Sequence, residues 1–158
     1  MSKSLTTPTP FDLTSIPPSF LENAGFVINR VAGQLNRQIE AVIAPLDLNI
    51  AQFGLMILLE LEGPQAQIML SRRVGLDRTS IMRSVDLLEA RGLVQRHPDP
   101  VDRRKHSVAL TDAGTALLAR TLPKVRAAER KYASVLSERE HKQLMGLLTR
   151  LLQTDQSS

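Results

Sequence analysis

A short turn containing glycine, followed closely by a change in residue period, is the sequence feature that most limits the fold of this chain. Residues 65–74 and 77–91 each have the apolar spacing of a helix, and Val74-Gly75-Leu76-Asp77 joins them. Gly75 suits a left-handed helix cap and Asp77 suits an N-cap. The segment therefore predicts a helix-turn-helix.

After Gly92 the period changes from that of a helix to the alternation of a strand. Val94 and Arg96 fall on one face of residues 93–97, and residues 105–110 alternate again. Residues 98–102 between them are rich in proline and aspartate, which favour a turn. The sequence therefore predicts a β-hairpin directly after the second short helix.

Longer helical segments flank this region. The first runs from Ser19 to just before Pro45, with apolar residues at three- and four-residue intervals over roughly seven turns. Its apolar side is wider than one neighbouring helix of the same chain would cover. The next helix follows from Asn49 and Gln52, which have capping-box spacing, and ends at Gly63.

The C-terminal third predicts further helices from Thr111 to residue 152. Pro123 is expected to kink or split the first of them. Ser137 and Glu140 form a second capping-box pattern that leads into the last helix. Residues 1–18, rich in Ser, Thr and Pro, predict a flexible arm, and residues 153–158 a polar tail.

Composition excludes several classes of function. The chain has 158 residues, no cysteine and a net charge of +4. Without cysteine there is no disulfide, thiolate metal site, iron–sulfur cluster or thiol redox sensor. The longest nearly apolar run, residues 53–59, is far shorter than the about 20 residues of a membrane helix. With no signal peptide pattern either, we expect a cytoplasmic protein without membrane association.

The second short helix carries candidate DNA-reading residues. On a helical wheel, Ile81, Ser84, Val85 and Leu88 face the core, whereas Thr79, Arg83, Asp86 and Ala90 face outward. Ser80 and Met82 flank the outward side, and Arg78 lies nearer the core boundary. Guanidinium and hydroxyl groups at an exposed helix N-terminus suit the major groove, so we predict DNA contacts by Arg78, Thr79, Ser80 and Arg83. A solvated helix face is the alternative, and Asp86 is expected to repel phosphate.

The hairpin turn supplies a second candidate contact. Arg103, Arg104 and Lys105 follow Asp102 there, and a projecting guanidinium can enter the minor groove. A solvated run of charge is the alternative. The charge distribution favours DNA: residues 1–64 hold three basic and six acidic residues, and residues 65–111 hold nine and five.

Catalysis and metal binding have little support in the sequence. His97, His106 and His141 are the only histidines, and no acidic residue at metal-ligand spacing completes a site with them. Neither a phosphate-binding glycine loop nor a nucleophile elbow is present. We therefore expect no enzyme, no cofactor and no metal. The rival to a DNA-binding protein is a protein-interaction adaptor that uses the same domain without DNA.

These features together resemble the MarR family of winged-helix transcription regulators. The similarity is carried by GLDRTSIMRSVDLLEARGLVQRHPDPVDRRKHSVALTDAG, within residues 71–114. Asp102, Arg104 and Leu110-Thr111 have the spacing of the family's wing signature. Asn49, at the start of the second helix, stands where the family often has threonine. The resemblance extends over about residues 20–152.

The resemblance implies a mainly α fold. Residues 46–111 would form a winged helix-turn-helix with a two-stranded wing, and residues 19–45 and 112–152 a dimerisation region. It further implies a homodimer that binds a pseudo-palindromic double-stranded DNA operator, with Arg104 in the minor groove. Asp102 would hold the wing by a salt bridge to an arginine such as Arg73.

The resemblance also implies a repressor released by a small phenolic or aromatic acid. Candidate ligand residues are Asn29, Phe53 and Met56, with core packing as the alternative for the last two. A small change in the spacing of the two reading helices would be enough to release DNA.

Overall fold

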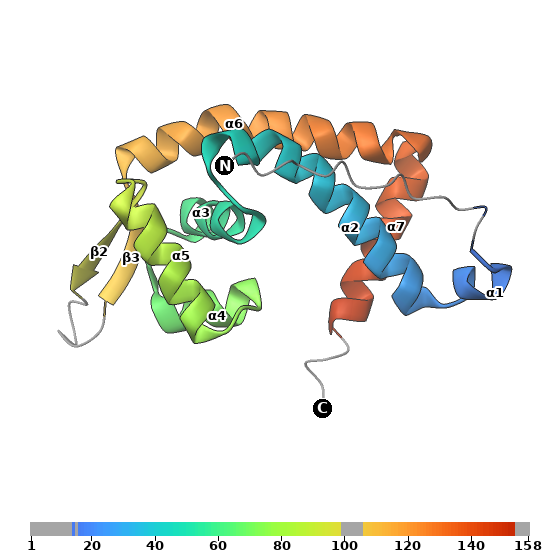
Figure 1. Cartoon of the computed structure of the whole chain (residues 1–158), viewed down its shortest axis with the longest axis horizontal. Coiled ribbons are helices and arrows are strands. Elements are labelled where there is room, and N and C mark those ends of the chain that lie inside the picture. The colour runs from blue at the N-terminus through green and yellow to red at the C-terminus, as the bar shows by residue number, and fades with distance from the viewer. Residues whose placement is uncertain (1–13, 15, 99–105, 154–158) are drawn as a thin grey trace, which may run out of the picture. The chain divides into compact units, whose positions relative to one another are not determined.

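The structure, a computed structural model, describes residue 14, residues 16–98 and residues 106–153. Contacts divide the chain into two compact units, Met1–Gln34 and Leu35–Ser158. The predicted division into a DNA-binding and a dimerisation region depends on a second copy of the chain and stays a prediction. The helices and strands are shown in Figure 1: α1 (Pro18–Leu21), α2 (Ala24–Ile43), η2 (Ala44–Leu46), α3 (Ile50–Glu62), β1 (Gln65–Ala66), α4 (Gln67–Val74), α5 (Arg78–Ala90), β2 (Val94–Pro98), β3 (His106–Leu110), α6 (Asp112–Tyr132), η3 (Ala133–Val135) and α7 (Glu138–Gln153).

In the first unit, the helix predicted from Ser19 is interrupted, because α1 ends at Leu21 and α2 begins at Ala24. The side chain of Asn23 accepts a hydrogen bond from the backbone N–H of Phe26 at 2.9 Å and so caps α2. The rings of Phe20 and Phe26 meet edge to face, with centroids 5.4 Å apart. The prediction of one unbroken helix is therefore wrong at its first turn. The apolar residues keep their helical spacing across the break at Asn23, so their pattern does not reveal it.

In the second unit, α3 begins with the predicted capping box. The Asn49 side chain accepts from the Gln52 N–H at 2.8 Å, and the Gln52 side chain accepts from the Asn49 N–H at 3.0 Å. The helix ends at Gly63, whose φ of 74° favours glycine. The face of α3 that is buried in the core carries Phe53, Leu55, Met56 and Leu59.

Helix α6 passes through Pro123 without a break, so of the two predicted outcomes, a kink or a split, the split is wrong. Leu118 and Val125, on either side of the proline, are both buried in the same core. That packing holds the two halves of the helix together although the proline cannot donate its backbone hydrogen bond. The core also receives buried side chains from α2, α4, α5, β2 and β3, namely Ile43, Leu70, Ile81, Val85, Leu88, Val94 and Val108.

The helix-turn-helix forms where the sequence predicts it. Gly75 ends α4 in the left-handed conformation with a φ of 70°, and its N–H donates to the Ser71 carbonyl at 3.1 Å. Asp77 then caps α5 by accepting from the Ser80 N–H at 2.9 Å. Both cap predictions are confirmed.

The wing strands belong to a sheet of three strands, ordered β1-β3-β2, rather than two. Strands β2 and β3 form the predicted antiparallel hairpin, in which Val94 pairs with Leu110. Strand β1 adds to the other edge of β3, where Gln65 pairs with Val108. The prediction of a helix from Gln65 is therefore wrong over residues 65–66, because two residues are too few to show the alternation of a strand.

Helix α7 is amphipathic, yet none of its residues is buried. Ser137 and Glu140 form the predicted capping box, in which the Ser137 N–H donates to the Glu140 carboxylate at 2.8 Å. The hydroxyl of Ser137 also donates to that carboxylate and lowers the pKa of Glu140. The exposed large apolar side chains of this helix are Leu144, Met145, Leu147, Leu151 and Leu152.

Within the described residues, none of the helices taken singly has the length and apolar character needed to cross a membrane. Ala24–Leu46 and Ile50–Glu62 meet the criterion only as a pair bent by 84°, and by length and composition alone.

Candidate nucleic-acid interface

The outward face of α5 is polar at its N-terminal end. Ile81, Ser84, Val85 and Leu88 are buried, as the helical wheel predicts. Arg78, Thr79 and Arg83 are exposed. For Arg78 and Arg83, the described part of the chain offers no carboxylate within ion-pair distance. The N-terminal end of α5 thus presents two cations and a hydroxyl outward.

Ser80, which is half-buried, holds the start of this helix. Its hydroxyl donates to the Asp77 carboxylate at 2.6 Å, and its backbone N–H donates to the same group. These hydrogen bonds, the hydroxyl's above all, lower the pKa of Asp77 because they favour the ionised carboxylate. The proton of the Ser80 hydroxyl is therefore engaged in the cap, and the predicted contact of Ser80 with DNA stays a prediction.

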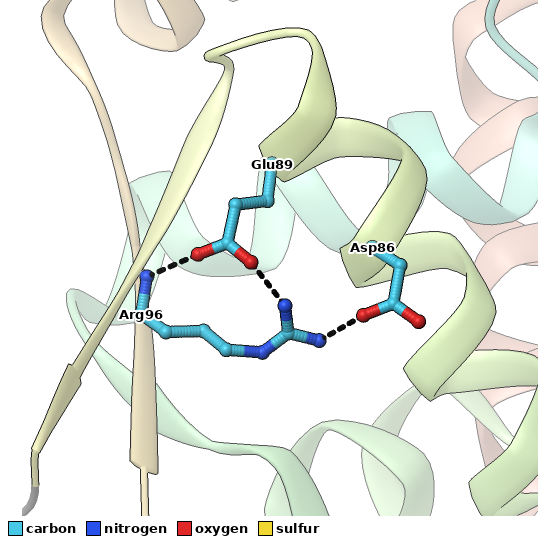
Figure 2. A network of polar contacts seen from close by, with 3 residues as sticks. All are labelled: Asp86, Glu89 and Arg96. Carbon is cyan, nitrogen blue, oxygen red and sulfur yellow. Dashed lines mark hydrogen bonds and ion pairs between the residues drawn. The ribbon is translucent and has the colours of Figure 1, made fainter.

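Asp86 and Glu89 on α5 are joined to β2 by the guanidinium of Arg96 (Figure 2). The backbone N–H of Arg96 also donates to the Glu89 carboxylate at 3.0 Å. Burial acts to lower the pKa of Arg96, but the hydrogen bonds and charges of Asp86 and Glu89 outweigh it and raise the pKa. Asp86 is thus paired with Arg96, a contact that the sequence did not indicate, and its expected repulsion of phosphate stays a prediction.

Helix α4 adds a further side chain to this cluster. With its amide oxygen turned toward Arg96, Gln67 accepts hydrogen bonds from Nε at 3.2 Å and Nη2 at 3.1 Å. One guanidinium therefore holds α4, α5 and β2 together. We call Gln67, Asp86, Glu89 and Arg96 the Arg96 clamp.

Two other arginines also make contacts inside the protein. Arg91 donates to the backbone carbonyls of Leu46 at 2.6 Å and of Asp47 at 2.7 Å, and so ties the end of α5 to the turn after α2. Arg73 pairs with Glu62 at the end of α3. Its suggested partner, Asp102, lies outside the described residues, as do Arg103, Arg104 and Lys105.

The internal roles of Arg91 and Arg96 could not be found from the sequence. Their partners lie seven to 45 residues away along the chain and follow no helical or strand period. A count of basic residues therefore overstates the charge that this region offers to a partner. Among the described cations of residues 65–111, Arg72, Arg78 and Arg83 are the exposed ones without such a contact in the described part of the chain.

Comparison with known proteins places this geometry in a family. The sequence model of the MarR family matches residues 46–105. The transcriptional repressor NicR of Pseudomonas putida is 30% identical over 158 residues, which cover 100% of this chain and 99% of NicR. The chain belongs to the MarR family. The winged-helix fold and the family membership predicted from the sequence are both confirmed.

Two solved structures are similar to this MarR-family chain over most of their length. One is the transcriptional repressor CouR bound to a 23-mer DNA duplex, with a TM-score of 0.80 and 28% identity, covering 85% of this chain and 96% of CouR. The other is BpsR of Bordetella bronchiseptica, whose structure concerns regulation of DNA binding by 6-hydroxynicotinic acid. It has a TM-score of 0.78 and 25% identity, and covers 86% of this chain and 97% of BpsR.

The candidate ligand residues of this MarR-family chain occupy different environments. Phe53 and Met56 are buried in the core of the second unit, the alternative that the sequence left open. Asn29, in the first unit, is exposed and lines a hollow of about 310 Å³ with Phe26, Arg30 and Gly33. Among the described residues, no three acidic or histidine side chains are close enough together to hold a metal ion.

Proposed function

We propose that this MarR-family chain is a sequence-specific transcription regulator that binds double-stranded DNA. The observation that carries the proposal is the N-terminal face of α5, where Arg78, Thr79 and Arg83 are exposed beside a wing fixed by the Arg96 clamp. Cations and a hydroxyl at a helix N-terminus fit the edges of bases and the phosphates of a major groove. NicR and CouR, both called transcriptional repressors, support this function.

The proposed contacts with DNA are of two kinds, those of α5 in the major groove and those of the wing in the minor groove. Arg83 points outward from the second turn of α5 and would read base edges, while Arg78 and Thr79 would contact bases or the backbone. Arg103, Arg104 and Lys105 would meet the negative potential of the neighbouring minor groove, with Arg104 entering it. The wing would in turn be held by Asp102, with Arg73 as a candidate partner.

The active form in this proposal is a homodimer. In a single chain, Leu147 and Leu151 of α7 and Val31 of α2 are exposed, an arrangement that costs free energy unless another surface covers them. A second copy would cover such faces and bring two reading helices onto successive major grooves of a pseudo-palindrome.

We further propose repression that is released by a small aromatic acid. BpsR, whose DNA binding is regulated by 6-hydroxynicotinic acid, supports this class of effector. In this chain the Arg30 guanidinium lies 5.4 Å from the centroid of the Phe26 ring, beside Asn29. A cation, an amide and an aromatic ring are suitable partners for an aromatic carboxylate.

The deciding experiment measures binding to duplexes selected from genomic DNA, by fluorescence anisotropy at about 50 and about 200 mM salt. Counterion release predicts a loss of affinity on the order of 10³-fold between these concentrations if about six phosphates are contacted. Adding 6-hydroxynicotinic acid, with its uncharged amide as control, tests release. If no duplex binds in a salt-dependent way, the DNA function is refuted and a protein-interaction adaptor is favoured.

A further inference from the structure

Met82 is a large apolar side chain in the polar surface of α5. It is 43% exposed, while the buried positions of the helix are Ile81, Ser84, Val85 and Leu88. Arg78 precedes it by one helical turn, and Arg83 follows it directly. The thioether therefore lies between two exposed cations and contributes little to the core.

The stripe of α5 that carries Met82 is covered at its other end. Met82, Asp86 and Glu89 follow one another at helical spacing, so they lie along one side of the helix. Figure 2 shows that Arg96 of β2 reaches over Asp86 and Glu89. The Arg96 clamp thus covers the C-terminal half of the stripe, and its uncovered N-terminal half carries Arg78 and Met82.

The chemistry of a matching partner follows from this arrangement. Arg78 and Arg83 favour a polyanion, whereas Met82 needs an apolar group set among that partner's charges. In the major groove, the 5-methyl group of thymine is the apolar feature on the base edges. Resting on the proposed function, we infer that Met82 contacts a thymine methyl in each half of the operator and is a specificity-determining residue.

The test uses deoxyuridine, which lacks the thymine methyl group and keeps the same hydrogen-bonding edge. Duplexes selected by the full-length protein from a random pool are remade with one thymine of each half-site replaced at a time. Wild type is expected to lose about fourfold in affinity per half-site at one thymine, the value of one buried methyl group. Met82→Ala is expected to bind the unmodified duplex more weakly by a similar factor and to be indifferent to the replacement.

Three variants separate a methyl contact from a general effect on the helix. Met82→Leu should keep the preference for thymine, and Met82→Gln should lose it although glutamine is an equally good helix former. Leu87→Ala is the matched control, because Leu87 is 47% exposed on the same helix but lies about 140° away around its axis. It should leave the preference unchanged.

The outcomes distinguish this inference from the proposed function. Salt-dependent binding by wild type with no thymine position sensitive to deoxyuridine overturns the role of Met82 and leaves the regulator intact. The same holds if Met82→Ala retains the full preference for thymine. If wild type binds no duplex at all, both the inference and the proposed function are refuted.

Discussion

The backbone carbonyl of Leu93 lies directly against Gly114, so that a Cβ added to Gly114 would stand 2.0 Å from the Leu93 oxygen. The same oxygen accepts a hydrogen bond from the Thr111 N–H at 3.1 Å. The start of α6 is thereby seated on the segment that leads into β2, and only glycine permits so close an approach.

Gly114→Ala is therefore expected to destabilise the protein by about 1–3 kcal/mol or more, because the backbone must shift to admit the methyl group. At an ordinary helical glycine, substitution by alanine has the opposite effect and stabilises the protein by roughly 0.5–1 kcal/mol. Gly54→Ala is the matched control, as a Cβ on Gly54 of α3 meets nothing within 4 Å. Equal shifts of the two variants in urea unfolding would show that the contact with Leu93 is unimportant.

The Arg96 clamp predicts a favourable coupling between Arg96 and Glu89. In a double-mutant cycle with Arg96→Met and Glu89→Gln, we expect about 0.5–1.5 kcal/mol of interaction free energy. The cycle with Asp86→Asn should give less, because the Asp86 side chain is 62% exposed and that of Glu89 is 38% exposed. Denaturant titration measures both cycles, and additive effects of Arg96 and Glu89 would contradict the clamp.

The cap of α5 predicts a dependence of stability on pH. The folded-state pKa of Asp77 is lowered, so the native state binds fewer protons than the unfolded state, and stability rises with pH in that range. The stabilisation by the Asp77 carboxylate is complete above about pH 5. It is lost as the pH falls through about 4, the ordinary pKa of aspartate, and on to the lower pKa of the folded state. Asp77→Asn keeps a capping oxygen that does not titrate.

The measurement is thermal unfolding of wild type and Asp77→Asn between pH 3 and pH 6. Taking the difference between the two proteins removes the contribution of Glu140, whose pKa is also lowered, in the cap of α7. The advantage of wild type over the variant should shrink on acidification. A difference that stays constant over this range would refute the role of the Asp77 charge.

Arg83→Ala is expected to weaken binding to a selected duplex by about 1–3 kcal/mol and to relax the preference at one position of each half-site. The reason is its outward position on α5 in the absence of an ion pair with a described residue. Arg126→Ala removes the same charge from an exposed position on α6 and serves as control. A repeated selection with Arg83→Ala that returns the wild-type sequence would argue against base reading.

The exposed apolar side of α7 predicts a dimer with a mass near 35 kDa, roughly twice the 17.5 kDa of one chain. Leu151→Glu should shift sedimentation toward the monomer without loss of helix content, because a carboxylate in an apolar interface must be desolvated. Leu61→Glu, at the exposed end of α3, is the control for a leucine outside this face. A wild-type monomer at micromolar concentration would contradict the dimer.

Features governed by neighbours along the chain could be predicted from the sequence. The caps of α3, α5 and α7 pair residues three positions apart, as with Asn49 and Gln52, so their chemistry is visible in the spacing. The buried side of α5 follows in the same way from its helical period.

Features that depend on distant contacts could not be predicted. The ion pair of Asp86 is one of them, because nothing in the order of residues shows that Arg96 would reach Asp86 from β2. The continuity of α6 through Pro123 has the same explanation, since it depends on the core that packs against both halves of the helix. The outward face of α5 can therefore be predicted from the sequence, whereas the contacts of Arg96 that join α5 to β2 cannot.

The pairing of Gln65 with Val108 has a consequence for how the protein acquires its fold. This pairing closes a loop of about 40 residues that contains α4, α5 and β2. The chain loses conformational entropy when the loop closes, before the few hydrogen bonds between β1 and β3 can compensate for it. Such long-range pairing slows folding and makes the enclosed elements depend on one another. During synthesis, α5 is therefore expected to reach its final stability only after β3 has left the ribosome.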